Sequence, residues 1–186
     1  MTATMTPTTS APWQIDATHT EVEFSARHLM ISNVKGRFSN PTGSLDFDPK
    51  KPTSLKLDVT IPVASIDTRN EQRDTHLRSA DFFDADTFPI ITFKGKRVDG
   101  DIKGTFKLTG DLTIRGVTRE VVLDVTSEGA GGDPWGNERL GFSATGKIER
   151  KDFGLVWNQV LETGGVAVGD TIKIVINTEL MRPKAK

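Results

Sequence analysis

Cysteine and tyrosine are both absent from this chain of 186 residues. Without a thiol, the protein cannot form a disulfide, use a thiolate as a nucleophile or bind zinc through sulfur. Long apolar runs are missing as well, because no stretch approaches the roughly 18 residues that a membrane-spanning helix needs. These gaps exclude several classes of redox, metal and helical membrane protein, although the lack of cysteine does not identify a cellular compartment.

The charges of the chain are balanced, with 24 basic and 25 acidic side chains and a formal net charge of −1. Nucleic-acid-binding proteins usually carry a basic excess, so this balance gives no reason to expect such a partner. Apolar residues make up 35% of the chain and charged residues 26%, which is typical of a soluble globular protein. The length fits one domain with a core of its own.

The N-terminal segment, MTATMTPTTSAP, differs from the rest of the chain. It contains neither a basic segment nor an apolar stretch, so it lacks the pattern of a secretory signal peptide. We expect residues 1–12 to form a disordered tail and residues 13–182 to form the folded domain. With no signal peptide and no membrane span, the protein is expected in the cytoplasm.

Apolar and polar residues alternate along most of the chain. In the segment EVEFSARHL, every second residue from Val22 to His28 falls on one face, which places His28 on the same side as Phe24. This period of two is typical of strands with one buried face, and it predicts an all-β protein. The pattern predicts eight strands, at residues 21–29, 34–48, 55–63, 90–98, 105–114, 120–125, 140–148 and 171–180.

Turn residues separate these strands. Asp99-Gly100 and Arg115-Gly116 lie between alternating runs, as in hairpin turns, and NPTG at residues 40–43 interrupts the second strand. Short turns between successive strands indicate antiparallel neighbours. Eight one-sided antiparallel strands favour a closed barrel or a sandwich, and closure removes exposed sheet edges.

One helix is expected, between the third and fourth strands. Thr68 and Glu71 have the spacing of a capping box, and residues 70–79 are good helix formers without glycine or proline. The helix has almost no apolar stripe apart from Leu77, so it should lie on an end of the barrel. A second irregular segment, residues 150–170, carries aromatic residues too, and the two segments could cover one mouth of the barrel.

Polar motifs do not indicate catalysis. His19, His28 and His76 match no metal-ligand spacing, so we expect no metal site and no cofactor. The segment GGVAVGDT has Asp170 where a phosphate-binding loop needs lysine, and GFSATG has Thr145 where a nucleophile elbow needs glycine. No enzyme class is therefore predicted.

Four segments of the chain are distinctive in their order and spacing: WQIDATHTEVEFSARHLMISNVKGRF, TRNEQRDTHLRSADFFDADTFPIITF, GDLTIRGVTREVVL and RKDFGLVW. Together they resemble the YceI-like family. The resemblance extends over residues 13–180 and implies a lipocalin-like, extended eight-stranded antiparallel barrel with one short helix capping an end. It further implies a homodimer that holds a polyisoprenoid, or in some members a fatty acid or its amide, in the interior. The family's founding type is periplasmic.

An apolar interior agrees with this resemblance, because an eight-stranded barrel has room for side chains or one slim ligand. Small residues on the inward face, such as Gly36, Gly110 and Ala144, are expected to leave space beside the aromatic rings. The predicted lining consists of Phe24, Ala26, Phe38, Val59, Phe82, Phe83, Phe93, Leu108, Leu112, Phe142 and Trp157.

Three functions stay open at this point. The first is a carrier for an isoprenoid lipid, such as a polyprenyl phosphate or a quinone precursor, and the second is the same barrel loaded with a fatty acid or fatty amide. The third is an enzyme acting on such a lipid, with His76 or His28 as base and Asp74 as an orienting partner. Candidate head-group contacts are Arg73, His76, Arg78 and His28, although a solvated helix face would explain the first three equally well.

Overall fold

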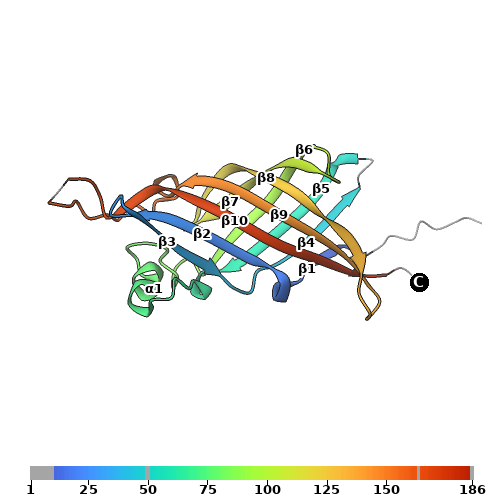
Figure 1. Cartoon of the computed structure of the whole chain (residues 1–186), viewed down its shortest axis with the longest axis horizontal. Coiled ribbons are helices and arrows are strands. Elements are labelled where there is room, and N and C mark those ends of the chain that lie inside the picture. Colours follow the sequence, from blue (N-terminus) through green and yellow to red (C-terminus); the bar gives the residue numbers. More distant parts are fainter. Residues whose placement is uncertain (1–10, 49–50, 163, 185–186) are drawn as a thin grey trace, which may run out of the picture.

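The computed structural model describes residues 11–48, 51–162 and 164–184, so most of the predicted tail lies outside the described residues. Nearly all of the regular structure is β-strand (Figure 1). The strands are β1 (Trp13–Ile15), β2 (Glu21–His28), β3 (Ser32–Phe38), β4 (Thr42–Asp48), β5 (Lys51–Pro62), β6 (Ile90–Gly100), β7 (Thr105–Ile114), β8 (Val117–Gly132), β9 (Asn137–Glu149) and β10 (Val168–Pro183).

The sheet closes into an antiparallel barrel. Its order is β1-β4-β5-β6-β7-β8-β9-β10, and β1 pairs with β10 as well as with β4, which completes the ring. Gln14 makes both contacts, opposite Ser44 on one side and Met181 on the other. β2 and β3 extend the sheet along β10 beyond this ring. The predicted eight-stranded antiparallel barrel is therefore confirmed, with additional strands outside it.

The predicted strand at residues 34–48 is two strands. β3 pairs with β2, whereas β4 pairs with β1 and β5. Asn40 lies between them with a left-handed φ of 57°, and the following Pro41 has no N–H to donate to a ladder. The strand prediction also missed β1, because three residues are too few to show a period.

Of the two predicted hairpin turns, the structure has the one at Arg115-Gly116 but not the one at Asp99-Gly100. Arg115 and Gly116 join β7 to β8 with φ values of 50° and 73°, which suits a two-residue hairpin turn. Asp99 and Gly100 instead continue β6, opposite Lys107 and Phe106. The turn follows at residues 101–104, where Gly104 N–H donates to the carbonyl of Asp101 over 2.9 Å.

The helix α1 (Glu71–Arg78) begins one residue later than predicted, and its cap is a different residue. Asn70 is the N-cap, with its side-chain oxygen accepting from the backbone N–H of Arg73 over 3.0 Å. Thr68 lies before the cap, and both its N–H and its hydroxyl donate to buried Asp74. The predicted capping box is therefore wrong.

No helix in the described part of the chain has both the length and the apolar character that membrane crossing requires.

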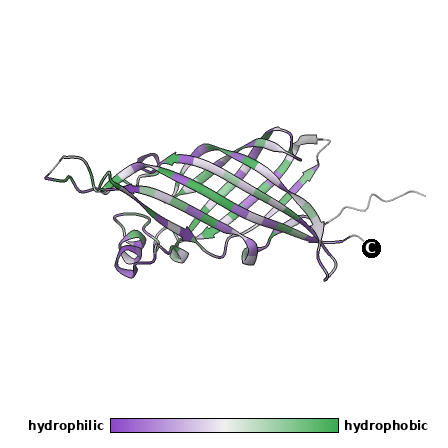
Figure 2. Ribbon diagram, in the orientation of Figure 1, coloured by the Kyte–Doolittle hydropathy of each residue, from purple (hydrophilic) through white to green (hydrophobic). Residues whose placement is uncertain are grey.

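The most tightly packed part of the core lies at the end that carries α1. Figure 2 shows apolar and polar residues alternating along the strands, as expected for a barrel with one face inward. At the α1 end, strand termini meet two short 3₁₀ helices, η2 (Val63–Ser65) and η3 (Arg150–Phe153). The fully buried side chains there include Ile61, Val63, Ile66, Phe82, Ile91, Ile114, Phe153 and Leu155.

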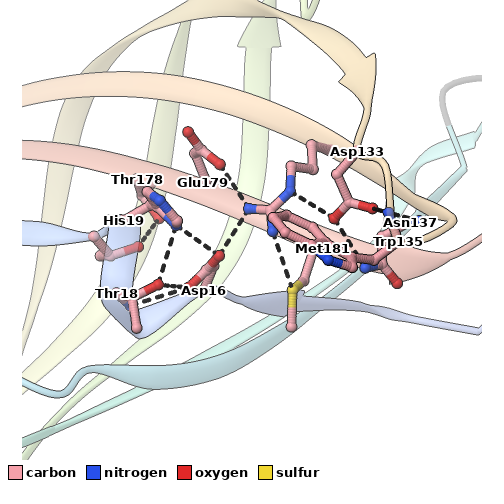
Figure 3. Close-up of polar contacts among 11 residues, drawn as sticks. Asp16, Thr18, His19, Asp133, Trp135, Asn137, Thr178, Glu179 and Met181 are labelled. Atoms are coloured by element: carbon pink, nitrogen blue, oxygen red, sulfur yellow. Dashed lines mark hydrogen bonds and ion pairs between the residues drawn. The ribbon is translucent and has the colours of Figure 1, made fainter.

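An ion-pair network holds β1 and the 3₁₀ helix that follows it, η1 (Ala17–His19), against the barrel (Figure 3). One guanidinium nitrogen of Arg139 on β9 lies 2.7 Å from Asp16 and 2.8 Å from Glu179 on β10. Its Nε lies 3.0 Å from Asp133 in the β8–β9 turn. Arg139 thus joins the closing strand to three other parts of the sheet.

The same contacts shift the acidity of the carboxyl groups. A hydrogen bond from Thr18 lowers the pKa of Asp16, and Arg139 adds to this effect against the opposing influence of burial. Burial raises the pKa of Asp133, but hydrogen bonds from Asn137 and Arg139 outweigh it and lower the value to about 2.

This network should make the protein acid-sensitive. Because the folded-state pKa of Asp133 is about 2 and the ordinary value is 3.8, its stabilisation is present above about pH 4 and lost as pH falls toward 2. Thermal unfolding should show the midpoint falling over that window. Arg139→Gln should unfold at lower temperature at pH 7 and show a smaller acid-induced decrease. Arg97→Gln, which removes the exposed pair with Asp99, should keep the wild-type profile, and an unchanged profile for Arg139→Gln would contradict this assignment.

Candidate functional site

Most of the predicted lining residues lie together in the structure, some on the barrel strands and others, such as Phe82 and Trp157, in the segments that cover its end. Ten of the eleven belong to one apolar cluster, and Ala26 on β2 is half-buried but outside that cluster. The fully buried members are Phe38, Phe82, Phe93 and Leu112, and the half-buried members that pack against them are Phe24, Val59, Phe83, Leu108, Phe142 and Trp157. Whether these residues contact a ligand stays a prediction.

Exposure changes along the interior. The strand residues Ile61, Ile91 and Ile114 at the α1 end are buried. Further along the barrel, Leu57, Phe106 and Phe142 belong to the same cluster but are only half-buried. The rings of Phe106 and Phe142 face each other edge-on with centroids 6.2 Å apart. Inward-facing apolar side chains of a solid core would be fully buried, so their partial exposure indicates an interior accessible from the end opposite α1.

The glycines in the wall act differently from the sequence expectation. A Cβ at Gly36 would come within 2.4 Å of the Phe24 ring, and one at Gly110 would come within 2.4 Å of the Phe93 ring. The glycines therefore do not leave open space beside the rings, because the rings occupy that space. They let the rings lie close to the strand backbone, which keeps aromatic volume out of the centre of the barrel.

A hollow of about 380 Å³ opens on the outer face of the barrel, and three of its lining residues, Phe106, Val125 and Ala144, also belong to the apolar cluster. It lies across β6 to β9 and is lined largely by polar residues of the outer face, among them Asp99, Lys107 and Asp124. Lys107 and Asp124 form an ion pair of 2.6 Å there. An open, ion-paired surface of this kind offers little to an apolar ligand.

The two irregular segments meet over one end of the barrel, as the sequence indicated. The His76 ring of α1 lies edge-on to Phe82 with centroids 5.0 Å apart, and edge-on to Trp157 at 4.8 Å. Phe82 and Trp157 also contact each other at 5.2 Å. Nε2 of His76 lies 2.8 Å from a carboxylate oxygen of Asp81. An aromatic layer with one histidine–carboxylate pair thus covers the α1 end.

The predicted head-group residues do not form one cluster. His28 is exposed at the last position of β2, so its predicted inward orientation is wrong; the strand ends there at the β2–β3 hairpin, beyond the barrel wall. The guanidinium of Arg73 donates to the hydroxyl and the carbonyl of Thr68, both over 2.7 Å, which gives it a structural role. Asp74 bonds to Thr68 as well, so the predicted partnership of Asp74 with His76 is also wrong: the partner is Asp81.

Arg78 has hydrogen-bonding capacity to spare. One of its terminal nitrogens lies 3.3 Å from exposed Glu71, and the other donates to the carbonyl of Ile66 over 3.3 Å. Its Nε is buried and has no hydrogen-bond partner among the described residues. A buried donor without a partner is unfavourable, so the hydrogen bonds of Arg78 are incompletely satisfied. Arg78 is therefore the cation of α1 best suited to donate hydrogen bonds to a polar group of a ligand.

Arg150 positions the aromatic layer, although no sequence pattern indicated this role. Its buried guanidinium donates to the carbonyls of Leu155 over 2.6 Å and Trp157 over 2.8 Å, and pairs with Asp170 at 3.1 Å. An isolated arginine in a polar segment resembles a surface residue, because the backbone carbonyls that it binds have no sequence signature.

One group of side chains has the composition of a metal site. Ligand atoms of Asp16, His19 and Glu179 lie within 4.8 Å of one another (Figure 3). The guanidinium of Arg139 already bridges the two carboxylates, and Nδ1 of His19 lies 2.8 Å from Asp16. A cation at this position would meet the charge of Arg139, so the arrangement fits an ion-pair network better than a metal centre.

A closed eight-stranded antiparallel barrel with an apolar interior and an aromatic cover at one end defines the fold class of this chain. The chain belongs to the YceI-like family, whose domain model matches residues 13–180. A UPF0312 protein of Staphylococcus aureus is 41% identical over 165 residues, covering 88% of this chain and 94% of its own length.

Two solved structures show the same fold. The YCEI protein of Campylobacter jejuni is 40% identical, with a TM-score of 0.70 and coverage of 84% of this chain and 90% of its own. A polyisoprenoid binding domain from Saccharophagus degradans has a TM-score of 0.63 and 14% identity, covering 92% of this chain and 98% of its own. At that identity the second likeness supports the fold alone.

The wall glycines give a direct test of how the interior is kept clear. Gly36→Ala should push the Phe24 ring, and with it Thr68, away from the wall, at a cost of about 1–3 kcal/mol of stability for overpacking. Binding of an apolar fluorescent probe should weaken because the ring then occupies the interior. Gly131→Ala, where a Cβ meets nothing within 4 Å, is the control. Unchanged probe binding in a folded Gly36→Ala protein would contradict this role.

Proposed function

We propose that this protein binds and carries a long isoprenoid lipid in the interior of its barrel. The observation that carries the proposal is the contiguous apolar cluster, which is sealed at the α1 end and half-exposed around Phe106 and Phe142. A narrow apolar interior that is accessible from one end suits a linear hydrocarbon chain better than a compact ligand. Catalysis is not part of the proposal.

We choose an isoprenoid by analogy with a structural neighbour that shares the fold. The Saccharophagus degradans domain is named for polyisoprenoid binding, and it shares this barrel over nearly its whole length. A fatty acid or fatty amide is the alternative ligand, since the same wall would accommodate an unbranched chain. The mass of the lipid that copurifies with the protein distinguishes the two.

The polar end of the ligand would meet Arg78 under this proposal. One of its terminal nitrogens makes only a long contact of 3.3 Å to exposed Glu71, which a charged oxygen of the ligand would replace. Charge-assisted hydrogen bonds of this kind favour an anionic head, such as a phosphate or a carboxylate, over a neutral quinone. Arg73 is unsuited to this role because Thr68 occupies its donors.

An enzyme that acts on the lipid is a second candidate, and one observation favours it. His76 and Asp81 form a histidine–carboxylate pair of 2.8 Å, which is the arrangement of a general base with its orienting partner. The ring of His76 is, however, packed edge-on against Phe82 and Trp157, which explains its position without any chemistry. The carrier therefore remains our proposal.

Blocking the interior should abolish lipid binding. Val59→Trp places a large side chain on the inner face of β5, whereas Asp58→Trp places the same side chain on the outer face one residue away. Native mass spectrometry of protein purified from cells should show bound lipid for wild type and Asp58→Trp, but not for Val59→Trp. Full occupancy of folded Val59→Trp would show that the lipid lies elsewhere. Recovery of a chemically altered lipid from wild type but not from His76→Ala would favour the enzyme.

The head-group assignment has its own test. Arg78→Gln should weaken binding of a polyprenyl phosphate by roughly tenfold, which corresponds to about 1.4 kcal/mol for a lost charge-assisted contact. Binding of a neutral polyprenol of the same length should change little, because the apolar wall is unaltered. Titration of delipidated protein with both lipids provides the measurement. An equal loss for both lipids would mean that Arg78 acts on the fold and not on the head.

A further inference from the structure

The β2–β3 hairpin presents apolar side chains to solvent at the α1 end. Leu29, Met30 and Ile31 form its turn, with exposed fractions of 36%, 52% and 76%. The β9–β10 connection lies beside it and carries Val160, which is 81% exposed. Leu29 N–H donates to the carbonyl of Ala167 in that connection over 2.9 Å. We call these four exposed residues, Leu29, Met30, Ile31 and Val160, the apolar tip.

The backbone of this turn is unfavourable for the residues that form it. Leu29 and Met30 have φ values of 48° and 60°, in the left-handed region that favours asparagine and glycine. Within the three-residue loop, the Ile31 N–H donates to the carbonyl of His28 over 3.1 Å and closes a β-turn with Leu29 and Met30 at its centre. Asn-Gly adopts a β-turn with two left-handed central residues most easily. The chain therefore keeps two large apolar side chains where both the backbone and the solvent disfavour them. Strain of this kind points to a function for the side chains.

A cationic hollow lies next to the tip on the outer face of the sheet. Its volume is about 310 Å³, and no carboxylate lines it; the lining residues are Ser25, Arg27, Asn33, Thr171 and Lys173. Arg27 and Lys173 form no ion pair among the described residues, and Arg27 donates only to the Met30 carbonyl. Two acidic residues lie on the same face: Glu149 accepts from the Thr171 hydroxyl, and Glu23 is two residues from Ser25 along β2.

A pair of lysines extends the positive charge of this surface. Lys173 on β10 lies directly opposite Lys147 on β9 in the strand register. Like charges in directly opposite positions destabilise a sheet, and no ion pair of either lysine relieves this in the described part of the chain. Together with the hollow, they give the outer face near the tip a charge that complements an anionic surface.

We propose that this end of the molecule docks on an anionic phospholipid membrane. The hairpin side chains enter the boundary between head groups and acyl chains, and the hollow with Arg27 and Lys173 takes a lipid phosphate. Apolar side chains next to unpaired cations are the combination that interfacial membrane binding requires.

The shape of this end favours a membrane over a second copy of the chain. Figure 1 shows the β9–β10 connection projecting beyond the barrel with the β2–β3 hairpin at its base. The four exposed side chains of the apolar tip make a small patch, whereas a stable dimer buries roughly 800 Å² per partner. The β9–β10 connection also carries exposed Glu162, and a carboxylate is unfavourable against an anionic membrane. The β2–β3 hairpin, and not the end of the connection, is therefore the part that faces the lipid.

This inference goes beyond the proposed function and does not depend on it. A barrel that carries lipid needs a membrane as source or destination, but docking is measured on the outer surface. Vesicle binding of delipidated protein therefore tests the tip alone, whereas copurified lipid tests the interior alone.

The experiment uses the full chain and vesicles of phosphatidylglycerol with phosphatidylcholine, compared with pure phosphatidylcholine, in a co-sedimentation assay. Leu29→Asn combined with Met30→Gly replaces two of the four tip residues by the preferred turn sequence. This variant should unfold at a higher temperature than wild type and bind the anionic vesicles at least about tenfold more weakly. Val122→Thr with Val175→Thr removes exposed valines from the barrel wall and should leave vesicle binding unchanged.

The charge contribution is tested separately with Lys147→Gln and Lys173→Gln. Together they should weaken binding to anionic vesicles and reduce its dependence on salt, while removing a like-charge pair from the sheet. Equal binding of wild type to both kinds of vesicle, or full binding by the Asn-Gly variant, would overturn the proposal. A wild-type dimer that becomes a monomer in that variant, with vesicle binding unchanged, would assign the tip to contacts between copies.

Discussion

Closure of the sheet through β1 is the constraint on which the rest of the structure depends. A strand of three residues pairs with β4 on one side and β10 on the other, and without it the ring would open along that seam. So short a ladder provides few hydrogen bonds, and Arg139 reinforces it from β9 through Asp16 and Glu179. Once the ring is closed, alternate side chains of every strand must face inward, and the interior takes its character from them.

The inward face was predictable because it depends only on local sequence. Parity along a strand determines which residues share a side, so Phe38, Val59 and Leu112 could be assigned to one lining before any pairing was known. The same argument failed for His28, since parity does not say where the barrel wall ends. The glycines were identified but misinterpreted, because the position of the Phe24 ring over Gly36 depends on a neighbouring strand.

Polar contacts between distant residues were not predictable from the sequence. Asp16 and Arg139 are separated by 123 positions, and neither lies in a motif that announces the other. The cap of α1 shows the same limit over a shorter distance, because Thr68 and Asn70 are both good N-cap residues. Tertiary contacts decided between them, since Thr68 is engaged by buried Asp74 and Asn70 is free to receive the helix N–H. The aromatic cover was predictable as two segments, but the buried arginine that orders it was not.

The two ends of the barrel carry different physical chemistry, and one segment connects the features of the α1 end. The β9–β10 connection contributes Trp157 to the aromatic cover, Val160 to the apolar tip and Ala167 as the partner of Leu29. Arg150 anchors its first half through the Trp157 carbonyl. The cover consists of ring contacts and a few hydrogen bonds, whereas continuous strand ladders hold the wall beside it. The cover therefore has the lower local stability of the two. A force applied at the tip therefore acts on the same segment that closes the interior.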